Sequence, residues 1–198
     1  MTRTDFLGEN KTWEYLHSLG VTKRHRMDLQ RGIENTPFFK ANKKYLEIDS
    51  SGEFVFKNPL LIFNECGIGK SFLAQQMVVE AFKFGKFWRI IKGEELQARF
   101  ECLETEGGFH RTNSFENIAS LADFDGLIID EADNIKKPEV LNRLLGHLHD
   151  NCVRFVLIGN CALNEFLATL EPKIVDRLLD KHYGTEIVGG QYASVRSN

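Results

Sequence analysis

From residue 60 onward, short apolar runs alternate with segments whose apolar residues recur every three or four positions. The apolar runs cover 60–63, 87–91, 126–130 and 153–158, and runs of this kind are typical of strands buried on both faces of a parallel sheet. The segments with helical spacing are 73–82, 94–104, 115–122, 138–148 and 173–181. Repeated strand–helix units predict an α/β fold with three layers, in which helices flank a mostly parallel sheet.

The first 57 residues follow a different pattern. A short helix is predicted over 13–19 before Gly20, and Thr36-Pro37 is typical of a helix start. Apolar and polar residues alternate at 45–48 and 53–56, around a polar turn, which predicts a hairpin. The change of pattern indicates two parts: a short basic N-terminal segment, residues 1–57, that docks a partner, and a main domain, residues 58–198.

The composition fits a globular protein. The chain has 198 residues, of which 42% are hydrophobic and 27% charged, and this excludes collagen-like, coiled-coil and wholly disordered chains. The apolar runs are far shorter than the roughly 20 residues that cross a bilayer, and the first residues lead into no apolar signal core. The four cysteines lie far apart, which favours reduced thiols over a disulfide frame or a zinc site. We therefore expect a cytoplasmic protein.

Charge is distributed unevenly along the chain. Residues 1–44 hold nine Lys/Arg and five Asp/Glu, an excess of +4, and because the whole chain carries −3, residues 45–198 carry −7. A basic segment on an acidic body could contact a phosphate backbone or an acidic partner. An ordinary solvated surface explains the same pattern equally well.

A phosphate-binding loop is the strongest chemical signal. Residues 64–71 stand between a predicted strand and a predicted helix and match the pattern G-x-x-x-x-G-K-[ST] at every position but the first. In such loops backbone N–H groups surround the phosphates, a lysine (here Lys70) reaches the β- and γ-phosphates, and a hydroxyl (here Ser71) holds Mg²⁺. The residues predicted to bind ATP are Asn64, Glu65, Cys66, Gly67, Ile68, Gly69, Lys70, Ser71 and Phe72.

Asn64 is the position that departs from the loop pattern, because it replaces the first glycine. Asparagine is among the few residues that tolerate positive φ, so the loop is still predicted to close. We expect the replacement to weaken ATP hydrolysis.

Two later strands end in polar side chains. The apolar run 126–129 leads into Asp130 and Glu131, and the run 155–158 leads through a glycine into Asn160. Carboxylates after a strand are by themselves more often a solvated turn, and an amide there is equally well a turn residue. Since ligands bind at the carboxyl ends of the strands in open α/β sheets, the phosphate loop upstream favours a catalytic interpretation. Asp130 is then a Mg²⁺ ligand with Ser71, Glu131 the general base and Asn160 a residue that orients the attacking water.

These three segments, followed by Pro172-Lys173-Ile174-Val175-Asp176-Arg177-Leu178, resemble the AAA+ ATPases over roughly residues 58–188. The resemblance is strongest to the helicase-loader and transposition-helper branch, the DnaC/IstB-like family. It implies that ATP and Mg²⁺ are cofactors, that Asn160 is the sensor 1 residue, and that Arg177 completes the site of a neighbouring subunit in a homo-oligomer. It also places Lys173 near the nucleotide. A surface salt bridge is the alternative role for Arg177.

The resemblance implies an ATP-dependent replication protein that loads or remodels a replicative DNA helicase on single-stranded DNA. Residues 19–26 resemble the lead-in that this family carries before its ATPase core, and Phe109, His110 and Arg111 could stack on and pair with single-stranded DNA. The first alternative is a transposition helper that marks target DNA for a transposase. The second is a non-hydrolysing nucleotide switch or adaptor that binds a host replication protein.

Overall fold

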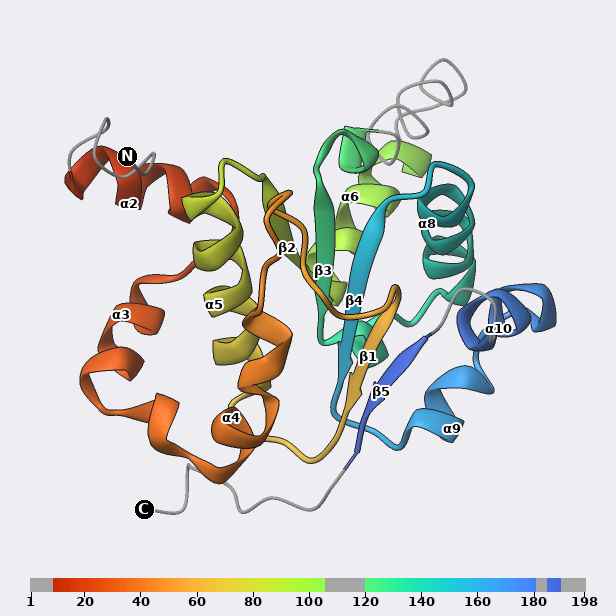
Figure 1. Cartoon of the computed structure of the whole chain (residues 1–198). Helices are drawn as coiled ribbons and strands as arrows, with labels where there is room; N and C mark the ends of the chain where they lie inside the picture. The colour runs from red at the N-terminus through yellow and green to blue at the C-terminus, as the bar shows by residue number, and fades with distance from the viewer. Residues whose placement is uncertain (1–8, 106–119, 181–184, 190–198) are drawn as a thin grey trace.

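The computed structural model describes residues 9–105, 120–180 and 185–189. At its centre lies one parallel sheet with the strand order β2-β3-β4-β1-β5 (Figure 1). The strands are β1 (Leu60–Phe63), β2 (Trp88–Lys92), β3 (Gly126–Asp130), β4 (Arg154–Gly159) and β5 (Glu186–Val188). Four of them lie within a residue of the apolar runs in the sequence. The predicted three-layer α/β fold is confirmed.

Helices occupy both faces of the sheet and the N-terminal segment. The α-helices are α2 (Glu9–Ser18), α3 (Lys23–Gln30), α4 (Pro37–Asn42), α5 (Lys70–Lys83), α6 (Gly93–Thr105), α8 (Pro138–Asp150), α9 (Leu163–Leu167) and α10 (Pro172–Leu179). The 3₁₀ helices are η1 (Ile33–Asn35), η2 (Lys43–Leu46), η3 (Ser120–Asp123) and η4 (Ala132–Asn134). Within the described ranges, no helix combines the length and the apolar character that a membrane span requires.

Two predictions fall partly or wholly on residues outside the described ranges. The helix predicted over 115–122 is described only from residue 120, where η3 begins. The loop with Phe109, His110 and Arg111 lies outside the described residues altogether. The proposed contact of that loop with DNA therefore stays a prediction.

Alternate residues of each central strand point into two separate cores. Leu60 and Ile62 of β1 pack into the core under α5, whereas Leu61 and Phe63 pack into the core under α6, α8 and α10. Figure 1 shows α5 and the N-terminal helices on one side of the sheet and α6, α8 and α10 on the other. Because all the strands are parallel, the carboxyl ends of β1, β3 and β4 meet at one edge.

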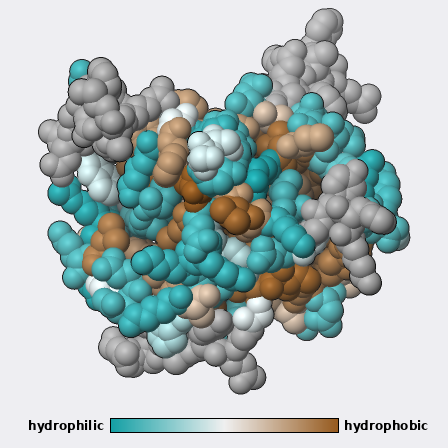
Figure 2. Space-filling model, viewed as in Figure 1, coloured by the Kyte–Doolittle hydropathy of each residue, from teal (hydrophilic) through white to brown (hydrophobic). Residues whose placement is uncertain are grey.

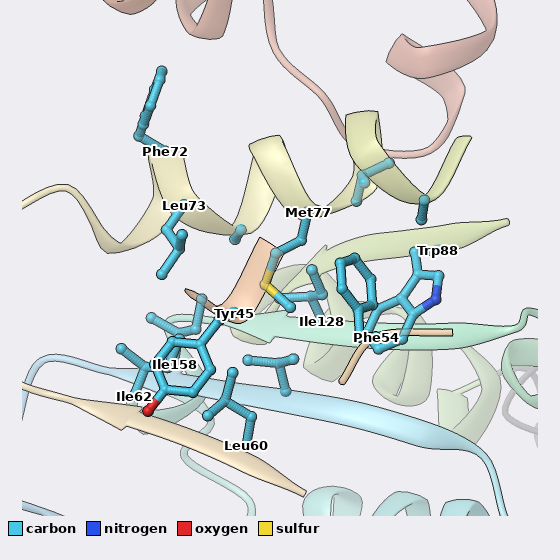
Figure 3. Close-up of a cluster of buried hydrophobic side chains, with 14 of the residues drawn as sticks. Tyr45, Phe54, Leu60, Ile62, Phe72, Leu73, Met77, Trp88, Ile128 and Ile158 are labelled. Atoms are coloured by element: carbon cyan, nitrogen blue, oxygen red, sulfur yellow. The ribbon is translucent and has the colours of Figure 1, made fainter. Parts of the chain in front are cut away.

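The N-terminal segment is part of the first core. Tyr45 and Phe54 are buried beside Met77 of α5 and Trp88 of β2 (Figure 3), and burial of one such side chain stabilises a fold by about 1.5–3 kcal/mol. The outer surface of the segment is polar: Figure 2 shows a largely hydrophilic face there, which includes the exposed side chains of α3. The segment is therefore fixed to the sheet on its inner side.

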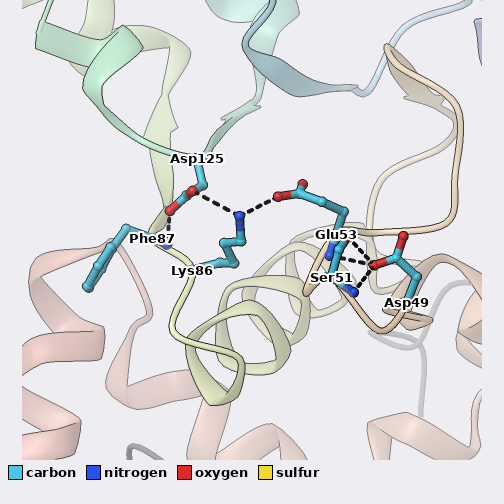
Figure 4. Close-up of polar contacts among 6 residues, drawn as sticks. All are labelled: Asp49, Ser51, Glu53, Lys86, Phe87 and Asp125. Atoms are coloured by element: carbon cyan, nitrogen blue, oxygen red, sulfur yellow. Dashed lines mark hydrogen bonds and ion pairs between the residues drawn. The ribbon is translucent and has the colours of Figure 1, made fainter.

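The hairpin predicted over residues 45–56 is present only as a short one around its predicted turn, with backbone hydrogen bonds between residues 49 and 53 and between 47 and 55. Tyr45 belongs to η2, and only one antiparallel bridge forms, between Ile48 and Phe54. The Asp49 carboxylate accepts hydrogen bonds from the backbone N–H groups of residues 51 and 53, at 2.8 and 3.1 Å, and this closes a compact turn (Figure 4). Lys86 holds the turn through Glu53 and also contacts Asp125. The segment curls because its aromatic side chains enter the core.

His25 joins α3 to α5. Its ring is buried and lies 4.7 Å, centroid to centroid, from the ring of Phe72. Its Nε2 lies 3.1 Å from Oε1 of Gln76, and Nδ1 has no hydrogen-bond partner among the described residues. Burial lowers the pKa of His25, although the Gln76 contact and the Asp28 charge act in the opposite direction. The joint therefore requires the neutral ring.

The His25 joint should make stability depend on pH. The unfolded chain takes up a proton near the ordinary histidine pKa of about 6.5, whereas the folded chain does so only at lower pH. The free energy of unfolding should fall as the pH drops below about 6.5, until the lowered folded pKa is reached. Urea titrations from pH 8 to 5 should show a smaller fall for His25→Gln than for wild type. The same fall in both proteins would contradict this role of His25.

Candidate nucleotide-binding site

A cavity of about 1190 Å³ lies at the carboxyl edge of the sheet. It is lined by the loop after β1, by Asp130 and Glu131 at the end of β3, and by Asn160 after β4. Its other wall comes from α3 and η1 of the N-terminal segment. Open α/β sheets bind ligands at this edge.

The phosphate loop has the backbone that its glycines predict. Gly67 and Gly69 have φ of +82° and +107°, a region that side chains with a Cβ rarely adopt. Helix α5 begins immediately afterwards at Lys70, so the N–H groups of its first turn and the positive end of its dipole lie at the cavity. Lys70 is only 5% exposed. Its Nζ donates to the carbonyl oxygens of Asn64 and Glu65, at 2.7 and 2.6 Å, and closes the loop.

Asn64 does not use positive φ, and that part of the prediction is wrong. Among the described non-glycine residues, only Glu131 and Cys152 have positive φ. The Asn64 side chain instead accepts a hydrogen bond of 2.8 Å from the N–H of Glu65. The loop start is thus held by a side-chain contact that a glycine could not make.

Ser71 and Asp130 form a pair suited to Mg²⁺. Asp130 is 6% exposed, and burial raises the pKa of its carboxyl, while a hydrogen bond from the Ser71 hydroxyl acts in the opposite direction. Hydroxyl and carboxylate oxygens are ligands that Mg²⁺ accepts, and it usually completes its shell with water and substrate phosphates. The described residues contain no group of three or more His, Cys, Asp or Glu able to hold a metal. A Mg²⁺ ion held by Ser71 and Asp130 would complete its shell with water and phosphate oxygens.

Glu131 follows Asp130 directly in the chain, and its backbone is strained. Its φ is +56°, and such left-handed non-glycine residues cluster at functional sites. Its Oε2 lies 3.4 Å from Nζ of Lys92, at the end of β2. Both side chains line the cavity. The lysine holds the carboxylate of Glu131 at the cavity wall.

The structure brings most of the predicted residues together. Those that line the cavity are Cys66, Gly67, Gly69, Lys70, Ser71, Phe72, Asp130, Glu131 and Asn160. Ile68 is fully buried in the core under α5, so only its backbone can face a ligand. Asn64 and Glu65 give their carbonyl oxygens to Lys70 instead of lining the cavity.

Arg177 and Lys173 lie elsewhere. Both belong to α10, and Nη1 of Arg177 lies 3.2 Å from the carboxylate of Asp150 at the end of α8. Arg177 borders a second, apolar cavity of about 120 Å³ with Pro59 and Val153, which precede β1 and β4. That cavity is at the opposite edge of the sheet. Lys173 pairs with Glu171 on the surface. A nucleotide contact of Arg177 or Lys173 would therefore have to be made with another subunit.

Several cavity residues were missed from the sequence. Thr22 and Gln75 line the cavity and are hydrogen-bonded to each other, since the Thr22 N–H and hydroxyl donate to Gln75 Oε1 at 2.7 and 2.9 Å. The others with ionisable side chains are His17, Arg24, Asp28, Arg31, Lys92 and Glu95. The family-like lead-in at 19–26 covers Thr22 and Arg24, and the basic excess over residues 1–44 includes Arg24 and Arg31. No pattern in the sequence pointed to Lys92 or Glu95.

Comparison with known proteins shows likeness in structure but not in sequence. No protein-family profile matches the chain, and no curated protein sequence does. AMPPCP-bound DnaA from Aquifex aeolicus superposes with a TM-score of 0.55 at 18% identity, over 87% of this chain and 49% of that one. The DnaC helicase loader superposes with a TM-score of 0.55 at 13% identity, over 76% of this chain and 88% of that one. DnaI superposes with a TM-score of 0.52 at 15% identity, over 89% of this chain and 88% of that one.

The chain spans about half the length of the two DnaA structures, the second of which holds AMPPCP and single-stranded DNA, and most of the length of DnaC and DnaI. At these identities the likeness establishes the fold alone. The chain has the same fold as these structures, with a five-stranded parallel sheet flanked by helices.

Proposed function

We propose that this chain is an ATP-dependent replication protein of the helicase-loader type, which binds ATP with Mg²⁺ in the large cavity and hydrolyses it. One observation carries the proposal: the closed phosphate loop, the Ser71–Asp130 pair, Glu131 and Asn160 all face the same cavity. These are groups of the kind that phosphoryl transfer to water uses, and their common cavity supports the proposal.

The chemistry assigns a task to each side chain. Backbone N–H groups of the loop and Lys70 hold the β- and γ-phosphates, while Ser71 and Asp130 hold Mg²⁺, which neutralises charge on the phosphates. Glu131 takes the proton of the attacking water, once its carboxylate is released from Lys92, 3.4 Å away. Asn160 orients that water. Arg177 of a neighbouring subunit stabilises the charge that develops on the transferring phosphate.

The task in replication is proposed from the neighbours in structure. DnaC is a helicase loader and DnaA binds AMPPCP and single-stranded DNA, so a replicative helicase and single-stranded DNA are the partners that we propose. The N-terminal segment, residues 1–57, is the proposed docking part, with its exposed basic side chains on α3. Co-precipitation of a hexameric helicase would support this role, and co-precipitation of a transposase would favour the transposition helper instead.

Lys70→Ala and Glu131→Gln should separate binding from turnover. Lys70→Ala removes charge-assisted hydrogen bonds to phosphate and should weaken ATP binding by about 10- to 100-fold. Glu131→Gln should keep the affinity but lower the rate of hydrolysis by about 10²- to 10⁴-fold. Isothermal titration with ATP and Mg²⁺ measures the first effect, and phosphate release with single-stranded DNA present measures the second.

Two outcomes would contradict the proposal. Unchanged ATP affinity in Lys70→Ala, with the native circular dichroism spectrum, would refute the loop assignment. ATP binding by wild type without any turnover, with or without single-stranded DNA, would refute hydrolysis and favour a nucleotide switch.

Arg177 should act between subunits. Arg177→Ala should bind ATP normally but lose hydrolysis by at least about a hundredfold, since fingers of this kind contribute 10³–10⁵ in rate. An equal mixture with Lys70→Ala should regain about a quarter of wild-type activity, because about one interface in four joins an intact loop to an intact arginine. No recovery in a mixture that does assemble would contradict action in trans.

A further inference from the structure

Two charged residues of α3, and Arg31 directly after the helix, line the nucleotide cavity together with the phosphate loop. Arg24, Asp28 and Arg31 line the cavity, and their spacing of four and three residues places them on one face of the helix. Asp28 lies between the two arginines, 3.5 Å from Nε of Arg24 and 3.9 Å from Nη1 of Arg31. The arginine side chains are 67% and 62% exposed, and that of Asp28 is 16% exposed.

The charges around the cavity leave this group positive. The lining cations are Arg24, Arg31, Lys70 and Lys92, and the lining anions are Asp28, Glu95, Asp130 and Glu131. Lys92 pairs with Glu131, and Glu95 pairs with Arg99, which is not among the cavity-lining residues. Two arginines share Asp28, so the group keeps one positive charge. Lys70 is held by neutral carbonyl oxygens. Arg24 and Arg31 thus bring one net positive charge to the cavity, in addition to the buried ammonium group of Lys70.

The wall that carries the arginines is fixed to the phosphate loop. A Cβ on Gly69 would lie 3.8 Å from Ile33 of η1 and 3.9 Å from Phe38 of α4, which are ordinary packing distances. His25 stacks on Phe72, and Thr22 is bonded to Gln75. Pockets for small ligands usually measure about 300–1,000 Å³, so a cavity of about 1190 Å³ can hold a whole nucleotide between the two walls.

We propose that Arg24 and Arg31 form a second phosphate-binding wall of this cavity, which binds the nucleotide phosphates in addition to Lys70. The inference rests on the proposed function of the cavity. A guanidinium binds phosphate oxygens in a two-pronged geometry, and a nucleoside triphosphate still carries net negative charge after one Mg²⁺ binds. The loose contacts of the arginines with Asp28 are exchanged for contacts with phosphate. Asp28 orients the arginines in the free protein and competes with the nucleotide for them.

The inference is tested by the affinities of ATP, ADP and adenosine for four proteins: wild type, Arg24→Ala, Arg31→Ala and Lys23→Ala. Lys23 is the matched control, because it is an exposed cation on the same helix that does not line the cavity in the described part of the chain. Each arginine variant should weaken ATP binding by about tenfold and ADP binding by less, and should leave adenosine unchanged. Lys23→Ala should stay within about twofold of wild type for ATP.

Asp28→Asn provides a test of opposite sign. It removes the competing carboxylate and should tighten ATP binding by a few fold, with the gain largest at low salt. Weaker binding in this variant would contradict the competition.

Three results would overturn the inference. One is ATP affinity in both arginine variants equal to that of wild type. Another is a loss of adenosine binding as large as that of ATP, which would mean that α3 contacts the base. The third is a loss of ATP affinity in Lys23→Ala as large as in the arginine variants, which would mean that the net charge of the helix acts at long range instead of two specific contacts. If the wild-type protein binds no ATP, the proposed function itself is refuted. That outcome differs from the three above, in which wild type binds ATP and only the comparison with the variants goes against the inference.

Discussion

The parallel alignment of β1, β4 and β3 is the constraint on which the site depends. The backbone pairing of Phe63 with Gly159 and of Ile129 with Leu157 brings three strand ends to one edge. Each group of the site stands at or directly after one of those strand ends: the phosphate loop after β1, the acids at 130 and 131 at the end of β3, and the amide at 160 after β4. The sheet alone therefore brings these groups to the same edge. Strands with one face in each core cannot slip in register without burying polar groups. The site is thus as stable as the two cores.

The N-terminal segment gives this sheet edge a second wall. Its buried aromatic residues pack in the core under α5, and its exposed basic residues face either solvent or the cavity. A ligand held by both walls would stabilise the contact between the segment and the sheet, because whatever binds only the folded arrangement shifts the equilibrium toward it. A partner docked on the segment would be coupled to the nucleotide in the same way.

The sequence predicted the elements whose cause is local. Apolar runs marked the strands, and Gly67, Gly69 and Lys70 marked the loop, because backbone conformation and phosphate chemistry demand these residue types. The hairpin is shorter than predicted because the Tyr45 ring enters a core formed by distant residues, which alternation along the chain does not reveal. The roles of Arg24 and Lys92 at the cavity depend on tertiary contacts between segments far apart. Positive φ was wrongly predicted for Asn64, whose side chain accepts a hydrogen bond from the N–H of Glu65 instead.

A crystal structure with AMPPCP and Mg²⁺ is the most direct test of the central claim. The account predicts phosphate density on the N–H groups of residues 67–71, Lys70 turned toward the phosphates, and a metal bound by Ser71 and Asp130. Density for the analogue at another surface, or a metal bound away from Asp130 while the loop stays closed on Lys70, would contradict it.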